Sequence, residues 1–161
     1  MPEFVMEGRG PAARTESDFV LGFLEALFFA ETSPAWDSSE WFSDECRAAQ
    51  DEGRADGSLP GDVGYDDLHP GALAAIRADC EAWQAENATA LAAAYATGYT
   101  PEQAGRDYYF TRNGHGVGFW CREELGDLGD TLTDACGRSE VYAWFEARAE
   151  HGDKPFAYVN L

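Results

Sequence analysis

The residues best suited to chemistry lie in the segment Arg-Asn-Gly-His-Gly, residues 112–116, and in the nearby Trp120. An imidazole transfers protons near neutral pH, and flanking glycines let a substrate or a backbone approach it closely. The segment lacks a Ser or Cys nucleophile in an elbow pattern, and it lacks the strand, helix and lysine of a phosphate loop. A structural turn, in which the histidine bonds nearby backbone, is the competing interpretation. For a small enzyme or ligand-binding protein, the candidate site residues are Arg112, Asn113, His115 and Trp120.

Metal ligands do not occur at the spacings that metal sites use. The cysteines at 46, 80, 121 and 136 form no Cys-x-x-Cys pair, and the histidines at 69, 115 and 151 are scattered. No His-x-His, His-Glu-x-x-His or Asp-x-Asp spacing accompanies the glycine-rich segment. We therefore predict no metal and no cofactor.

The charge of the chain points to a different kind of function. The 161 residues include 30 acidic side chains against 11 basic ones, which gives a formal net charge of -19. A strong negative potential repels nucleic acid and anionic membranes, and it steers basic proteins toward the molecule. We expect no direct nucleic-acid binding, no membrane and a basic protein as partner. The alternative is that the acidity only maintains solubility or reflects the composition of the host.

Carboxylates are concentrated between residues 37 and 67, where ten acids face only Arg47 and Arg54. The local net charge is therefore -8, almost half of the excess of the whole chain. This segment is rich in Gly and Pro punctuation, which predicts irregular structure. The candidate partner-binding residues in it are Asp51, Glu52, Asp56, Asp62, Asp66 and Asp67.

A second set of acids recurs at helical spacing near the C-terminal third of the chain. It consists of Glu123, Asp127, Asp130 and Asp134, with apolar positions between them. On one helix these carboxylates would advance by about 6, 4.5 and 6 Å along the axis. Phosphates are also regularly spaced along the axis of a nucleic acid, so a cationic groove built for phosphates would accept such a row. The competing interpretation is the solvated face of an amphipathic helix.

Three to four helices and a C-terminal antiparallel hairpin are predicted to position these residues, in a mainly helical α+β fold. Thr15 and Asp18 resemble a capping signal for a first helix, which is apolar nearly all round and therefore central to the core. A short helix is expected around residues 38–50 and a long one from Pro70 to about Thr97.

The following segments contain the clearest start and turn signals. Thr100-Pro101-Glu102-Gln103 matches a capping box with proline at the first helical position, so a helix should run through Phe110. A last helix carries the acidic row. Two β-rich runs separated by Gly152 and Asp153 then predict the hairpin.

The chain is expected to form one acidic α+β domain over residues 15–161, preceded by a flexible arm over residues 1–14. A domain of this length buries enough surface for a normal core. The N-terminus is acidic where a signal peptide is basic, and the apolar run from Phe19 to Ala30 is short for a membrane span and carries Glu25. We predict a cytoplasmic protein with reduced thiols.

Residues 99–135 resemble a family of small acidic proteins, mostly of unassigned function, from tailed phages and related mobile elements. The resemblance rests on the pattern Thr-Arg-Asn-Gly-His-Gly-x-Gly-Phe-Trp, followed by Leu-Gly-Asp-x-Leu-Thr. The resemblance implies an acidic residue directly after the Trp, where this chain has Cys121, and this departure weakens any idea of a catalytic or metal-binding carboxylate there.

A phage origin bears on the charge by analogy. Phages encode small acidic proteins that occupy the nucleic-acid-binding surfaces of host defence enzymes. The resemblance therefore implies an accessory protein of the DNA-mimic type, an anti-restriction or anti-CRISPR inhibitor acting in the cytoplasm of the host cell. The alternatives are the small enzyme or ligand-binding protein described above and a structural or assembly subunit that pairs through its hairpin. The oligomeric state stays open.

Overall fold

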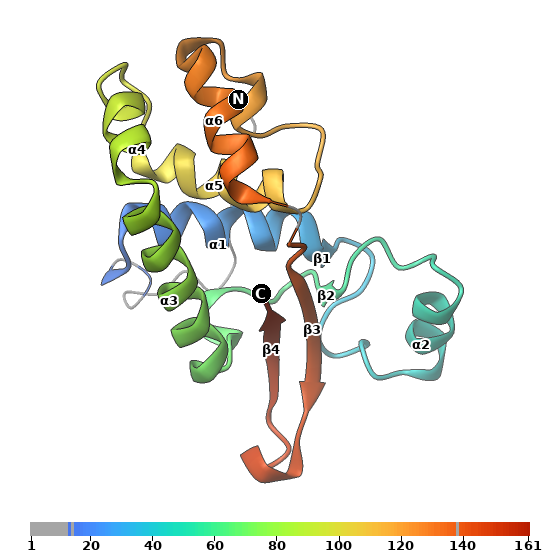
Figure 1. Cartoon of the computed structure of the whole chain (residues 1–161). Coiled ribbons are helices and arrows are strands. Elements are labelled where there is room, and N and C mark those ends of the chain that lie inside the picture. The colour runs from blue at the N-terminus through green and yellow to red at the C-terminus, as the bar shows by residue number, and fades with distance from the viewer. Residues whose placement is uncertain (1–12, 14, 138) are drawn as a thin grey trace.

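The structure is a computed structural model that describes residue 13, residues 15–137 and residues 139–161. The described residues form six α-helices and two two-stranded sheets (Figure 1). The mainly helical α+β class is confirmed, with more helices than the three to four predicted. The helices are α1 (Asp18–Glu31), α2 (Asp44–Asp51), α3 (Pro70–Glu86), α4 (Ala88–Tyr95), α5 (Pro101–Arg112) and α6 (Asp127–Cys136).

The N-terminal arm predicted over residues 1–14 lies outside the described residues, except for Ala13, which is buried against the core. The cap of the first helix lies two residues later than predicted. Ser17, rather than Thr15, is the N-cap of α1, and its hydroxyl accepts a hydrogen bond from the backbone N–H of Val20 at 3.3 Å. The serine is preferred because its oxygen reaches the third helical N–H.

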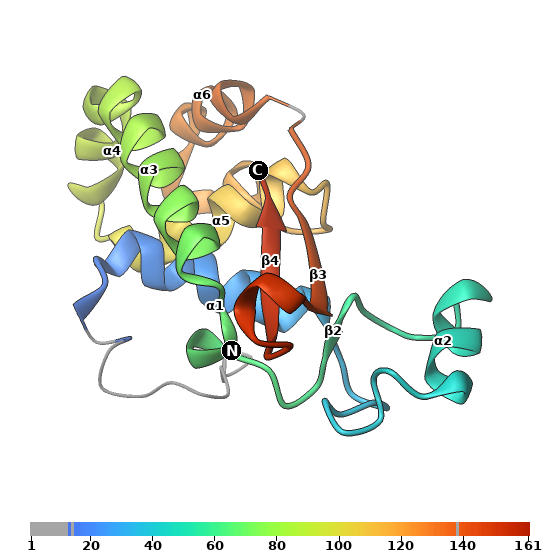
Figure 2. The ribbon, with the colours of Figure 1, turned by 90° about the horizontal axis from the view of Figure 1, so that it is seen from below.

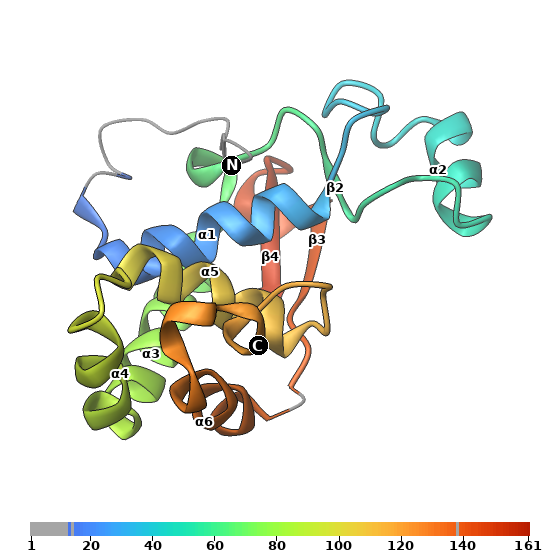
Figure 3. The same cartoon turned by 90° about the horizontal axis from the view of Figure 1, so that it is seen from above.

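Helix α1 lies at the centre of the molecule, beside α5 (Figure 3). All ten residues from Phe19 to Phe28 are buried, as the apolar sequence predicts. Two glycines permit the close packing of these helices. A Cβ atom at Gly22 would overlap the backbone of Glu102, and one at Gly105 would overlap the backbone of Phe19. Aromatic side chains from α1, α3 and α5 fill the space around this contact.

The predicted single helix from Pro70 to about Thr97 is wrong, because the chain breaks it at Asn87 into α3 and α4. The side-chain amide and the backbone N–H of Asn87 both donate to the carbonyl of Trp83, at 2.9 and 3.1 Å. Asparagine competes for local backbone groups in this way and so favours helix ends. The break allows α4 to contact α6, and the indole N–H of Trp83 donates to the carbonyl of Ala135 at 3.2 Å.

The C-terminal hairpin is confirmed. Strand β3 (Tyr142–Ala147) pairs antiparallel with β4 (Pro155–Asn160), and Gly152 and Asp153 adopt positive φ in the turn. The backbone N–H of His69 donates to the carbonyl of Ala157 at 2.9 Å, which fastens β4 to the start of α3.

A second, parallel pair of strands was not predicted. Strands β1 (Thr32–Ser33) and β2 (Leu59–Pro60) pair with each other and so bring together the two ends of the segment between them. This segment carries α2 and projects from the helical body (Figure 2). The expected helix around residues 38–50 therefore exists but begins later, at Asp44. Ser43 caps it by accepting from the N–H of Cys46 at 3.1 Å.

Candidate functional site

Three of the four acids in the predicted row lie together on α6. Asp127, Asp130 and Asp134 are exposed, while Leu132 and Cys136 on the opposite side are buried. At 3.6 residues per turn the three acids fall within a sector of about 60°. Among the described residues, none of these three carboxylates has an ion pair or an accepted hydrogen bond. They are therefore available to a partner.

The fourth member of the row, Glu123, is not on the helix, so that part of the prediction is wrong. Glu123 is exposed but belongs to the short 3-10 turn η4 (Glu123–Leu125), and α6 begins only after Gly126. Gly126 has φ 52°, which ends any continuous helix at this point. The close packing of the first turn of α6 against the chain at Phe119 also requires a glycine at position 129, because a Cβ there would lie 2.7 Å from the carbonyl oxygen of Phe119.

The acids between residues 37 and 67 have a different local environment. Asp62 accepts hydrogen bonds from the backbone N–H and hydroxyl of Ser38, at 2.7 and 2.6 Å. Asp67 accepts from the N–H of Gly64 at 2.9 Å, and Glu52 pairs with Arg54 at 2.6 Å. These carboxylates support the loops that carry them. Of the six predicted partner-binding residues, Asp67 is half-buried and the others are exposed, namely Asp51, Glu52, Asp56, Asp62 and Asp66.

The two acid-rich regions do not form one face. Helix α6 lies against α4 and α5, whereas α2 and its flanking loops project from a different part of the molecule (Figures 1 and 2). A single rigid groove of a partner would therefore contact one of them and not both. The structure thus separates two candidate surfaces that the sequence places in one list.

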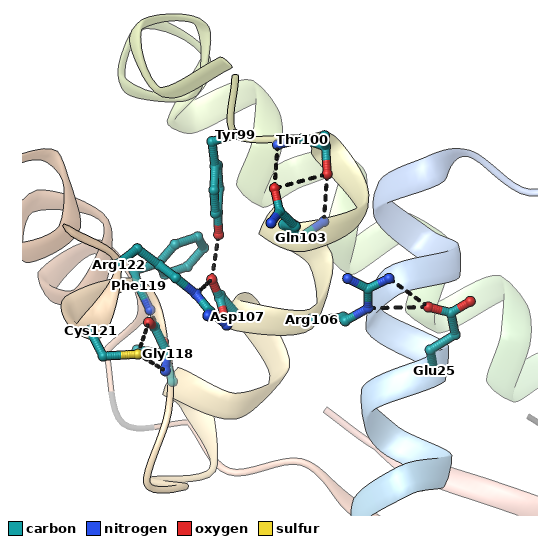
Figure 4. A network of polar contacts seen from close by, with 11 residues as sticks. Glu25, Tyr99, Thr100, Gln103, Arg106, Asp107, Gly118, Phe119, Cys121 and Arg122 are labelled. Carbon is teal, nitrogen blue, oxygen red and sulfur yellow. Dashed lines mark hydrogen bonds and ion pairs between the residues drawn. The ribbon is translucent and has the colours of Figure 1, made fainter. Parts of the chain in front are cut away.

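Most of the described arginines pair with carboxylates of the chain itself. The buried Asp107 binds Arg122 through two hydrogen bonds, of 2.7 and 2.8 Å, and it also accepts one from the hydroxyl of Tyr99 at 2.6 Å (Figure 4). Burial raises the pKa of Tyr99, which keeps this donor protonated. The other such pairs are Arg77 with Glu16, Arg106 with Glu25 and Glu102, Arg112 with Asp79, and Arg148 with Glu146.

Glu25 is a carboxylate that lies buried in the core. It is 3% exposed, and desolvation raises its pKa, with the neighbouring charge of Glu102 acting in the same direction. Arg106 opposes this effect by pairing with Glu25, as Figure 4 shows, and also with Glu102. Five of the seven described arginines thus pair with buried or half-buried acids.

Arg112 and Asn113, the first two residues of the glycine-rich segment, have structural roles. Arg112 is 4% exposed, and its guanidinium donates to Asp79 at 2.7 Å and to the carbonyl of Ser139 at 2.9 Å. The amide of Asn113 bonds both backbone groups of Val141, at 2.7 and 3.1 Å. These two side chains fasten the end of α5 to the approach to β3, so neither is free for a substrate.

The rest of the motif is also explained largely by packing. The hydroxyl of Thr111 accepts from the N–H of Phe119 at 3.2 Å, and a Cβ at Gly118 would overlap that hydroxyl. Phe119 is fully buried. Cys121 takes the place of the expected acid, and its sulfur accepts from the N–H of Gly118 at 3.4 Å and donates to the carbonyl at 3.1 Å (Figure 4).

His115 and Trp120 are the candidate residues of the motif whose side chains remain exposed. Trp120 is 53% exposed. The imidazole of His115 stacks on Tyr109, with ring centroids 5.9 Å apart, and faces a recess of about 350 Å³. The recess brings together residues from α1, the loop before β2, the motif loop and the start of β3: Glu31, Ser58, Asn113, His115, Glu140, Val141, Tyr142 and Ala143.

Sequence reasoning found only two of these lining residues. Glu31 lies 84 positions before His115 in the chain, and Glu140 lies 25 positions after it. No spacing rule connects residues so far apart, because only the packing of α1 on α5 and the pairing of Asn113 with Val141 bring them together. The recess is therefore a product of the tertiary structure.

No three His, Cys, Asp or Glu side chains gather in the described part of the chain in a way that would hold a metal ion. None of its helices combines the length and the apolarity that crossing a membrane requires. Comparisons of the chain with family models, with curated proteins and with solved structures give no match, so the candidate surfaces are interpreted from their own geometry.

Proposed function

We propose that this protein binds a basic, nucleic-acid-handling protein and blocks its nucleic-acid site. The observation that supports the proposal most is the division of charge described above. Most described arginines pair with acids of the chain itself, whereas Asp127, Asp130 and Asp134 lie exposed along one side of α6 and have no ion pair with any described residue. A negative charge with no structural role costs stability through repulsion, which favours a role in binding.

The geometry of α6 suits a groove that accepts phosphates. The three acids advance along a rigid axis by about 4.5 and 6 Å, a spacing that a flexible tail would not hold. Lys and Arg side chains that normally neutralise phosphates would contact them instead. Binding of this kind steers association and weakens steeply as salt is added. By analogy with phage inhibitors, a restriction, CRISPR or repair enzyme of the host is the kind of partner proposed.

A matched pair of charge-reversal variants tests the proposal. D130K/D134K reverses two acids of the proposed surface, and E81K/E86K makes the same charge change on exposed positions of α3. Asp127 is left unchanged because it is the first residue of α6, where the interaction of an acid with the helix dipole is strongest. Each protein is immobilised and exposed to bacterial lysate at low salt, and bound proteins are eluted with duplex DNA and identified by mass spectrometry.

The proposal expects nucleic-acid enzymes that the parent and E81K/E86K retain, that DNA elutes and that D130K/D134K does not retain. Purified enzymes from this set should then lose DNA binding in the presence of the parent protein. If all three proteins retained the same enzymes equally, the binding would depend on the overall net charge and not on the acids of α6. Retention only of proteins that DNA does not displace would overturn the proposal.

A further inference from the structure

The recess beside His115 is lined by charged and aromatic groups that have no role in the proposed function. Two carboxylates, those of Glu31 and Glu140, line it together with the imidazole and the phenol ring of Tyr142. No Arg or Lys is among the lining residues. Its volume of about 350 Å³ is at the small end of the range for ligand pockets and suits one side chain rather than a large cofactor.

Two hydrogen bonds hold the carboxylate of Glu31 in place. The hydroxyl of Tyr109 donates to Oε1 at 2.8 Å, and the hydroxyl of Ser58 donates to Oε2 at 2.6 Å. Burial raises the pKa of Tyr109, so this donor stays protonated. Each oxygen of Glu31 keeps a second lone pair. A fixed carboxylate with spare acceptor capacity is prepared to receive a charged donor without reorganisation.

The outer wall of the recess combines charge with an aromatic surface. Tyr142 is 58% exposed, and its hydroxyl donates to Oε2 of Glu140 at 2.6 Å. Among the described residues, the imidazole nitrogens of His115 make no hydrogen bond to the protein. A ligand that suits this wall needs a positive charge, several N–H donors and a flat face that stacks on a ring. A guanidinium group has all three, whereas an ammonium lacks the fork of donors and the flat face.

We infer that the recess lined by Glu31, His115, Glu140 and Tyr142 binds the guanidinium of an arginine side chain on the basic partner protein. This inference rests on the proposed function for the identity of the occupant, since a nucleic-acid-handling surface is rich in arginine. The occupied recess would add a specific anchor to the long-range attraction of the acidic surface. Aromatic residues and arginine are the side chains that most often contribute such anchors.

The chain contains a second recess that serves as an internal comparison. It measures about 340 Å³ and has three carboxylates, those of Asp37, Glu40 and Asp62. Asp37 accepts from Ser39, and Asp62 accepts from Ser38, so two of the three are engaged by their own loops. A ligand attracted only by negative charge would bind at both recesses, whereas a guanidinium recognised by the His115 recess would not.

The inference is tested with the full chain and a capped tripeptide, acetyl-Gly-Arg-Gly-amide, by following backbone amide signals in NMR. The same peptide with lysine, the same peptide with uncharged citrulline, and methylguanidine are titrated in parallel. With the arginine peptide we expect saturable shifts confined to the recess, at residues 31, 58, 113–117 and 140–143. Lysine should bind several-fold more weakly, and citrulline should cause no saturable shift. E140Q should weaken arginine binding several-fold, while E40Q in the second recess should leave it unchanged.

Three results would overturn the inference. Arginine shifts spread evenly over all acidic surfaces, or unchanged binding in E140Q, would show that no specific site exists. Tighter binding of methylguanidine than of the peptide would assign the recess to a free small molecule instead of a protein side chain. Because this titration uses no partner, its failure would leave the result of the D130K/D134K experiment standing, and the two proposals can fail separately.

Discussion

The segment between residues 37 and 67 and helix α6 are both strongly acidic, yet several carboxylates of the segment have internal contacts, whereas those of α6 have none within the described structure. In the segment, Asp37, Asp62 and Asp67 accept hydrogen bonds from nearby backbone and hydroxyl groups. On α6, Asp130 and Asp134 have no such contacts within the described structure, and the apolar face of the helix is buried instead. The segment has ten acids and α6 has three, so composition alone would favour the segment as the binding surface.

The difference shows that the density of charge is a poor guide to the surface that binds. An acid that stabilises its own loop is constrained by the fold, and changing it alters the structure before it alters binding. An acid with no internal contact has no such constraint. The comparison can be tested by measuring how much stability each class of carboxylate contributes.

The largest loss of stability is expected for a carboxylate that the core itself requires. D107A would leave the guanidinium of Arg122 and the hydroxyl of Tyr99 without their acceptor. Removing one member of a buried pair strands the other, and we expect a loss of about 3 kcal/mol, moderated because Arg122 is partly exposed. Urea unfolding followed by circular dichroism measures it. D107L/R122M should recover much of the loss, and a cost below about 1 kcal/mol for D107A would contradict the role given to this pair.

An intermediate loss is expected in the acidic segment, and almost none on α6. D62A removes two hydrogen bonds to Ser38, and we expect a cost of about 1 kcal/mol because the site is exposed. D134A removes no side-chain contact within the described structure, so the free energy of unfolding should change by less than about 0.5 kcal/mol. The two variants make the same change of charge and are compared by the same urea unfolding. Equal losses would remove the distinction between the two regions.

A smaller and local effect is expected on acidification. The hydrogen bond from the Ser39 hydroxyl lowers the pKa of Asp37 below its usual 3.8, so the folded chain favours the charged form more than the unfolded chain does. This stabilisation is present at neutral pH and is lost as the pH falls through the lowered pKa. The amides of Ser39 and Glu40 should then exchange faster with deuterium while those of α6 stay protected. In D37N this pH dependence should disappear. If the amides of α6 lost protection at a higher pH than those of Ser39 and Glu40, the contrast between the two acidic regions would be wrong.

Much of the fold follows from local patterns. The apolar sequence of α1 predicted a central helix, the Thr100 to Gln103 capping box marked the start of α5, and Gly152 with Asp153 marked the hairpin turn. These signals work because each depends on residues a few positions apart. The failures, the break at Asn87 and the loss of Glu123 from α6, occurred where one residue changes the backbone inside an otherwise periodic segment.

The sequence by itself determined the charge, the helical character and the segments that carry charged or reactive side chains. Only the tertiary structure decided which of those groups are free. Arg112 looks like a catalytic or binding residue beside His115, but long-range contacts with Asp79 and Ser139 commit it to the core. The recess beside His115 takes its carboxylates from α1 and from the segment just before β3. The physical reason is that hydrogen bonds and packing act between neighbours in space, and the linear order of residues specifies those neighbours only within a few turns of chain.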